Sequence, residues 1–146
     1  MYLYQEHYIG ANYKHRNITG TVDIKKDGKP IKIDFNRISA ITENVGYWRK
    51  ANHIHAWFVR NCQDGEDDCR RAYVSIDDLE KLLKDCEAVR DNHDLAAELL
   101  PTQNGFFFGG TEYDEYYFRD IDDTIAIVKP ILDEDSAAEY YYTSSW

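Results

Sequence analysis

The sequence contains few cysteines, prolines and methionines: of 146 residues, three are Cys, three are Pro and one is Met. No apolar run approaches the ~20 residues that a membrane-spanning helix needs. The first residues also lack the basic stretch followed by an apolar stretch that marks a secretory leader. We therefore expect a cytoplasmic protein with no membrane partner, whose three cysteines are reduced.

A surplus of basic residues is also missing. Lys and Arg total 17, whereas Asp and Glu total 27, and the formal net charge is −10. Proteins that bind duplex nucleic acid normally carry a basic surplus, so we expect no long nucleic acid as a partner. The charge is uneven, because residues 14–50 contain nine basic and four acidic residues, which gives them +5. This part can bind a small anion, or it can form a solvated surface opposite in sign to the rest.

Signatures of enzymes and metal sites are absent as well. There is no Gly-x-Ser-x-Gly turn, P-loop or His-Glu-x-x-His helix. Cys62 is a weak candidate nucleophile, since a reduced structural cysteine is far commoner. His53 and His55 on one helix would point about 200° apart. Cys62 and Cys69 lack the close spacing of structural zinc sites, so we expect no catalytic residue, no metal and no cofactor.

Apolar and aromatic residues are plentiful. Hydrophobic residues make up 43% of the chain, and Tyr occurs 12 times. A chain of this length and composition is typical of one domain, which we place at 1–146 because no linker or repeat interrupts it. The tyrosines either line a core or sheet or form a recognition surface, where rigid rings add contact area at little entropic cost.

The first third of the chain has the alternation of strands. Met1–Gly10 is rich in aromatic residues, Ile18–Lys26 and Ile31–Phe35 alternate, and Arg37–Tyr47 forms a third, less regular run. Asp27-Gly28 is a strong hairpin signal. We predict an N-terminal antiparallel β-meander.

Helical spacing then takes over. We predict a helix over Trp48–Asn61 and a second helix that begins at a capping box of Ser75 and Asp78. A short helix over Asp94–Leu100 and a short strand over Phe106–Phe108 follow. The last element is a long helix from Tyr113 to Leu132, with Pro130 near its end. We expect Ile76, Leu79, Leu82, Leu83 and Val89 to face inward on the second helix. The tail from Asp133 is acidic and then aromatic, and we expect it to fray. The predicted class is α+β.

Two segments gather groups that recognise nucleotides. In GYWRKANHIHAWF, residues 46–58, Trp48 lies outside the apolar stripe of Ala51, Ile54 and Phe58 and shares a helix face with Asn52 and His55. In PTQNGFFFGGTEYD, residues 101–114, amides and a tyrosine lie beside glycines. Rings stack on bases, Arg holds phosphate and amides pair with base edges. The predicted ligand-binding residues are Tyr47, Trp48, Arg49, Lys50, Asn52, His55, Gln103, Asn104 and Tyr113. The alternative is that the rings are core and the polar groups cap helices or face solvent.

These segments also carry a resemblance. GYWRKANHIHAWF, QDGEDDC and LLPTQNGFFFGGTEYDEYY, together with the MYLY opening, are similar to a widespread family of small phage proteins, which we identify with the anti-CBASS sponges that capture cyclic dinucleotides. The resemblance covers Met1 to about Leu132. It implies a phage immune-evasion protein that sequesters a signal such as cyclic GMP–AMP without cleaving it. It also implies a tetramer in the cytoplasm of the infected bacterial host. A chain of 146 residues has little surface to enclose a dinucleotide alone, so we expect a homo-oligomer, a dimer or tetramer.

Two other functions remain open at this point. Carboxylates spaced along the later helices could mimic DNA and occupy a basic groove on a host nuclease or another basic host protein. A nucleotide or sugar-phosphate hydrolase is the third possibility, although it would need a nucleophile or metal cage that the sequence does not offer.

Overall fold

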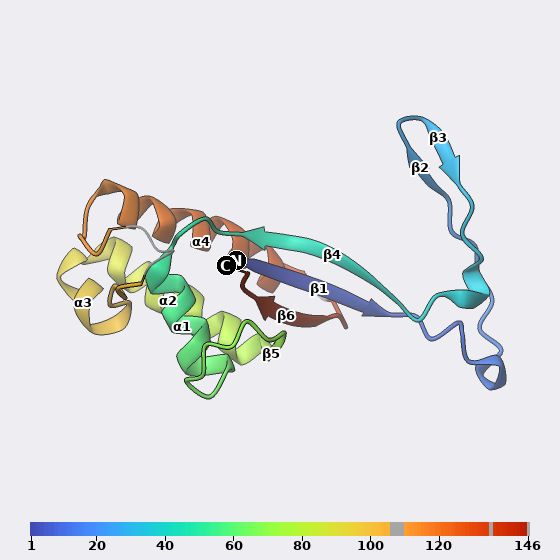
Figure 1. Cartoon of the computed structure of the whole chain (residues 1–146), viewed down its shortest axis with the longest axis horizontal. Helices are drawn as coiled ribbons and strands as arrows, with labels where there is room; N and C mark the ends of the chain where they lie inside the picture. Colours follow the sequence, from blue (N-terminus) through green and yellow to red (C-terminus); the bar gives the residue numbers. More distant parts are fainter. Residues whose placement is uncertain (106–109, 135, 146) are drawn as a thin grey trace.

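The computed structural model describes residues 1–105, 110–134 and 136–145 of an α+β protein (Figure 1). Its strands are β1 (Tyr2–Tyr8), β2 (Ile24–Lys26), β3 (Lys29–Ile31), β4 (Ala40–Tyr47), β5 (Ala72–Val74) and β6 (Glu139–Thr143). Its α-helices are α1 (Asn52–Cys62), α2 (Ile76–Asp91), α3 (Ala96–Leu99) and α4 (Glu115–Asp133), and its 3₁₀ turns are η1 (Lys14–Arg16), η2 (Phe35–Arg37) and η3 (His93–Leu95). The predicted class is therefore confirmed.

The main sheet has the antiparallel order β4-β1-β6-β5, so its two central strands come from the two ends of the chain. The prediction that the tail frays is wrong, because β6 pairs with β1 on one side and β5 on the other. Tyr140 and Tyr142 alternate with Glu139 and Tyr141, and both are buried in the core. β6 is the late strand of the fold. The strand predicted at Phe106–Phe108 lies outside the described residues.

The predicted turn at Asp27-Gly28 is confirmed, with φ values of 52° and 75° in the left-handed region that such hairpins require. The hairpin does not join a meander, however, because β1 pairs directly with β4 and β2–β3 forms a separate two-stranded sheet. Its strands are also shorter than predicted. Residues 12–39, which we call the arm, contain no buried residue, and in Figure 1 the arm extends from the ends of β1 and β4 away from the helices.

The helices cover one face of the main sheet. The capping box that begins α2 is confirmed, since the Ser75 hydroxyl accepts from the Asp78 N–H and the Asp78 carboxylate accepts from the Ser75 N–H. Leu79, Leu82 and Val89 are buried as predicted, whereas Ile76, the first helical residue, is 42% exposed. Pro130 lies inside the last turn of α4. Among the described residues, no helix is long and apolar enough to cross a membrane.

Helix α1 is the centre of the core. Every residue from Asn52 to Val59 is buried, and the Phe58 ring stacks on Tyr142 of β6 with centroids 4.1 Å apart. The helix begins four residues later than the predicted Trp48, because Lys50 has a left-handed φ of 63° that is incompatible with a continuous right-handed helix. His53 of α1 packs against Tyr117 of α4, and His55 of α1 contacts Asp67 in the loop before β5.

Candidate functional site

A pocket of about 260 Å³ lies between the β4–α1 connection and the first turns of α4. Residues Arg49, Lys50, Asn52 and His53 line one side, and Tyr116, Tyr117, Arg119 and Asp120 line the other. The two sides come from segments far apart in the sequence. The short connection Arg49–Ala51 holds the first side against α4, since Trp48 before it and Ile54 after it are buried anchors.

Asn52 fixes the shape of the pocket. Its Oδ1 accepts a hydrogen bond from the Gln103 N–H at 2.8 Å, and its Nδ2 donates to the Gly110 carbonyl at 3.0 Å. The side chain thus joins α1 to the segment that precedes α4. Asn52 lines the pocket, but its amide already holds the backbone, so it positions the wall of the pocket.

Three cations border the pocket without a carboxylate partner. Arg49, Lys50 and Arg119 line it, and within the described part of the chain none of them lies within 4.0 Å of an acidic oxygen. The Arg119 guanidinium lies over the Tyr116 ring, 4.9 Å from its centroid. The guanidinium lies over one face of the ring, and Tyr116 is still 59% exposed, so the pair presents a charge together with a partly open aromatic ring.

His53 lies in the wall of the pocket and is 2% exposed. Its Nε2 is buried and has no hydrogen-bond partner among the described residues, and its ring packs 4.1 Å from that of Tyr117. Burial lowers the pKa of His53 to about 3, so the ring is neutral at physiological pH. The sequence prediction missed His53; its only signal was membership of the same dense segment.

Carboxylates also line the pocket, and their surroundings differ. Asp114 is the N-cap of α4 and accepts hydrogen bonds from the N–H groups of Tyr116 and Tyr117, so its charge faces the positive end of the helix dipole. Burial, and then the negative charges of Asp123 and Asp114, raise the pKa of Asp120 to about 6. Asp120 therefore exchanges a proton near neutral pH, which is the range of general acids and bases.

His55 points away from this pocket, and the prediction that it contacts the same ligand as Asn52 is wrong. Its Nε2 lies 3.0 Å from the Asp67 carboxylate and its Nδ1 lies 2.7 Å from the Tyr142 hydroxyl. A carboxylate can only accept, so Nε2 donates to Asp67, while Nδ1 shares a hydrogen bond with the Tyr142 hydroxyl. His55 is fully buried and connects α1 to β6 and to the loop that follows α1.

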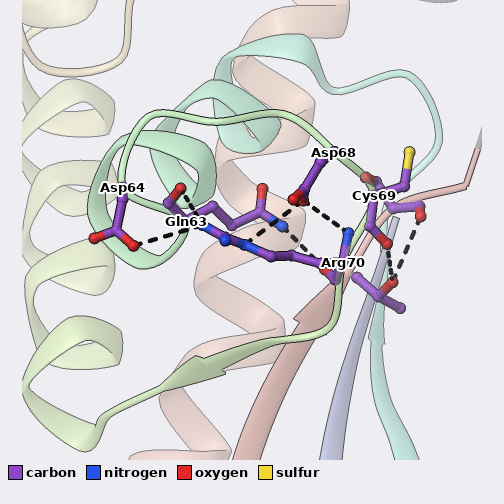
Figure 2. A network of polar contacts seen from close by, with 7 residues as sticks. Gln63, Asp64, Asp68, Cys69 and Arg70 are labelled. Carbon is purple, nitrogen blue, oxygen red and sulfur yellow. Dashed lines mark hydrogen bonds and ion pairs between the residues drawn. The ribbon is translucent and has the colours of Figure 1, made fainter.

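That loop, residues 63–71, is held by Arg70 (Figure 2). The guanidinium donates to the Gln63 carbonyl at 2.6 Å and lies 3.5 Å from Asp64 and 3.6 Å from Asp68. In return the Gln63 side-chain amide donates to the Arg70 carbonyl at 3.0 Å. Figure 2 shows these contacts closing the loop on itself beside β6, so the charges here serve the fold.

Trp48 is a core residue, and its predicted role as a stacking platform is wrong. It is 3% exposed, its ring lies 5.7 Å from Phe58, and its Nε1 donates to the Thr124 hydroxyl at 2.9 Å. Gly46 makes this position possible, because a Cβ there would lie 2.9 Å from Ile127 and 3.1 Å from the Trp48 ring.

The remaining predicted residues do not line the pocket. Tyr47 is 54% exposed on β4 and contacts Tyr2. The side chains of Gln103 and Asn104 are exposed, and Gln103 enters the site only through its backbone N–H. Tyr113 packs edge-on against Tyr117, 5.0 Å away, and so supports a ring that does line the pocket.

The described residues contain no group of three or more metal-ligating side chains. Burial raises the pKa of Cys62 to about 12, so its thiol is protonated and unreactive. No family model, curated protein or solved structure matches this chain.

Proposed function

We propose that the protein binds a small phosphate-bearing ligand of the cyclic dinucleotide class in this pocket and holds it without cleaving it. The observation that carries the proposal is the meeting of three cations, Arg49, Lys50 and Arg119, which have no ion pair among the described residues, at one cavity beside an exposed aromatic ring. The resemblance to phage sponges supplies the class of ligand, and the pocket supplies the chemistry.

The cations suit a phosphodiester. Arg49 and Lys50 come from the connection before α1 and Arg119 from α4, so a phosphate between them would receive charge from both sides of the pocket. A hydrogen bond to a charged group contributes about 1.5–3 kcal/mol. Two such bonds would hold a phosphate more strongly than the neutral groups of the pocket hold a nucleoside.

The base has a separate platform. Tyr116 exposes more than half of its surface beside Arg119, and stacking on an aromatic ring contributes about 1–3 kcal/mol per base. His53 adds a buried nitrogen without a partner in the described chain, which could accept a hydrogen bond from a base amine or a ribose hydroxyl. The ligand would then satisfy a group that the folded chain leaves unsatisfied.

The size of the pocket limits how the ligand sits. A volume of about 260 Å³ is just below the roughly 300–1,000 Å³ of pockets that enclose a drug-sized molecule. We therefore expect one nucleotide unit of a cyclic dinucleotide inside the pocket. The second unit would extend over the exposed surface of Tyr116 and Arg119.

Titration calorimetry with cyclic GMP–AMP, GMP and guanosine tests the proposal. We expect Arg119→Ala to weaken both phosphate-bearing ligands at least tenfold and to leave guanosine nearly unchanged. Arg90→Ala is the matched control, because Arg90 is exposed, lies outside the pocket and forms an ion pair with its neighbour Asp91. Absence of binding by all three ligands, or an equal loss in the control, would contradict the proposal.

A hydrolase is the second candidate, and Asp120 is the observation that favours it, because its pKa of about 6 suits proton transfer. Chromatography of the nucleotide after incubation with excess protein and heat denaturation separates the two functions. We expect intact ligand. Linear products that disappear with Asp120→Asn would make the protein an enzyme.

A further inference from the structure

A row of tyrosines crosses the face of the main sheet opposite the helices. Register places Tyr47 beside Tyr2, Tyr4 beside Tyr141, and Tyr141 beside Tyr73, so the row has members on all four strands. We call these five residues the tyrosine face. Neighbouring rings are close: the centroids of Tyr2 and Tyr47 lie 5.3 Å apart and those of Tyr73 and Tyr141 lie 5.9 Å apart.

The tyrosine face is open to solvent at its two ends. Tyr47 and Tyr73 are 54% and 57% exposed, and Tyr2, Tyr4 and Tyr141 between them are half-buried, whereas Leu3 and Tyr142 on the opposite face of β1 and β6 are fully buried. A polar pair borders the row, in which the Arg71 guanidinium lies 3.8 Å from the Tyr141 ring and donates to Glu6 at 2.8 Å. A row of rings with exposed ends and a polar rim is typical of an interaction surface.

The arm carries a second uncovered surface of complementary character. Ile24 and Ile31 are directly paired across the hairpin, and together with Ile33 they are 41–44% exposed. Lysines surround them: Lys25 and Lys26 precede the turn, and Lys29 and Lys32 follow it. A two-stranded hairpin without a packing partner is marginally stable in water, so this hairpin needs a surface to cover it.

The two surfaces lie in separate parts of the molecule. Figure 1 shows the β2–β3 hairpin at the far end of the arm, beyond the point where β1 and β4 end. Residues 12–39 contain seven basic and three acidic residues, a net charge of +4, which leaves −14 on the rest of the chain. A second copy would therefore offer this arm both an opposite charge and a row of rings whose two end members are exposed.

We infer that the arm of one copy packs across the tyrosine face of a second copy, and that the second copy does the same in return. The isoleucines would bury apolar area against the rings, and the lysine ammonium groups would lie over ring faces as cation–π partners. A reciprocal contact of this kind closes on a two-fold axis, the commonest symmetry of soluble oligomers. The inference does not depend on the ligand of the pocket.

Light scattering and native mass spectrometry of the full chain test it with three variants. Ile24→Asp with Ile31→Asp alters the arm, and Tyr47→Ser with Tyr73→Ser alters the face; all four positions are exposed, so the core is untouched. Ile76→Asp is the control, because it makes the same change at a residue of equal exposure outside both surfaces. We expect the wild type and the control to have a mass of at least twice 17.1 kDa. Both double variants should dissociate to monomers at protein concentrations at least tenfold higher than the wild type does.

Mixing the arm variant with the face variant gives the decisive result. A mixed assembly retains one intact arm on one intact face, so it should form more tightly than either variant does alone. A wild-type mass of 17.1 kDa at every concentration would overturn the inference. So would an assembly that either double variant leaves unchanged, or a mixture that restores nothing.

Discussion

Helix α1 carries two buried histidines whose surroundings differ. On one side, His55 contacts the Asp67 carboxylate and the Tyr142 hydroxyl, and Arg70 closes the adjoining loop. On the other side, the Nε2 atom of His53 has no hydrogen-bond partner in the described chain. Arg49, which lines the same pocket, has no ion pair among the described residues. The polar groups of the first side connect elements of the fold, although Gln63 Oε1 there also lacks a partner among the described residues. Those of the second side lie at the pocket that we propose to bind a ligand.

The difference has an energetic meaning. A buried polar group without a partner costs about 1–3 kcal/mol, so a fold that keeps one at a cavity gives up stability there. A ligand that supplies the missing partner recovers this free energy on binding. The comparison therefore teaches where to look for function: at the histidine whose hydrogen bonds are incomplete.

The largest effect should come from His55→Ala. This substitution leaves a cavity and removes the partner of the buried Tyr142 hydroxyl, so we expect a loss of about 3–5 kcal/mol in the free energy of unfolding. Urea denaturation measures it. His53→Ala removes a side chain of the same size from the same helix, but the Nε2 atom of His53 has no hydrogen bond in the described chain to lose. We therefore expect it to lower the free energy of unfolding by roughly half as much as His55→Ala. Equal losses would show that the two sides do not differ.

His53 should control how stability depends on pH. Its folded pKa of about 3 is below the ordinary value of 6.5, so the unfolded chain takes up the proton first. The stability from its neutral form is present above pH 6.5 and is lost as pH falls from 6.5 toward 3. Between pH 7 and pH 5 the loss should be about 2 kcal/mol. His53→Leu should remove this part of the slope, and an unchanged slope in urea titrations would contradict the assignment.

Arg70→Ala should reduce stability by about 1–2 kcal/mol, because the guanidinium donates at 2.6 Å to a backbone carbonyl, a charge-assisted bond. Its ion pairs with Asp64 and Asp68 add little, since exposed pairs contribute about 0–1 kcal/mol. Arg49→Ala is the matched change on the pocket side and should alter stability by less than about 0.5 kcal/mol. Thermal unfolding of both variants side by side checks the contrast.

Sequence reasoning predicted the parts of the fold that local interactions determine. The capping box at Ser75 and Asp78 and the turn at Asp27-Gly28 each depend on a few neighbouring residues, and both are present. The place of β6 in the sheet depends on pairing with β1 from the other end of the chain, and no local signal encodes that. Trp48 was misplaced for a related reason: the left-handed Lys50 separates it from the helix whose periodicity was used to orient it.

The site was predictable in the same partial way. Arg49, Lys50 and Asn52 are neighbours in the sequence and do line one pocket. Tyr116, Arg119 and Asp120 were missed, because α4 reaches the pocket only through tertiary packing. Choosing between His53 and His55 required knowledge of which side of α1 meets Asp67 and Tyr142.

Asp120→Asn should have a small effect of the opposite sign. The folded pKa of Asp120, about 6, is above the ordinary value of 3.8, so the folded protein binds the proton more readily than the unfolded chain. Its carboxylate therefore lowers stability above pH 6, and this penalty is relieved as pH falls from 6 toward 3.8.

Asn resembles the protonated acid, so the variant should be more stable than wild type at pH 7 by about 1 kcal/mol or less, because solvent screens a half-buried charge. The difference should shrink toward zero near pH 4, and Asp122→Asn, at an exposed position on the same helix, should show no such trend. A difference between Asp120→Asn and wild type that stays constant from pH 7 to pH 4 would show that the proton on Asp120 is not its cause.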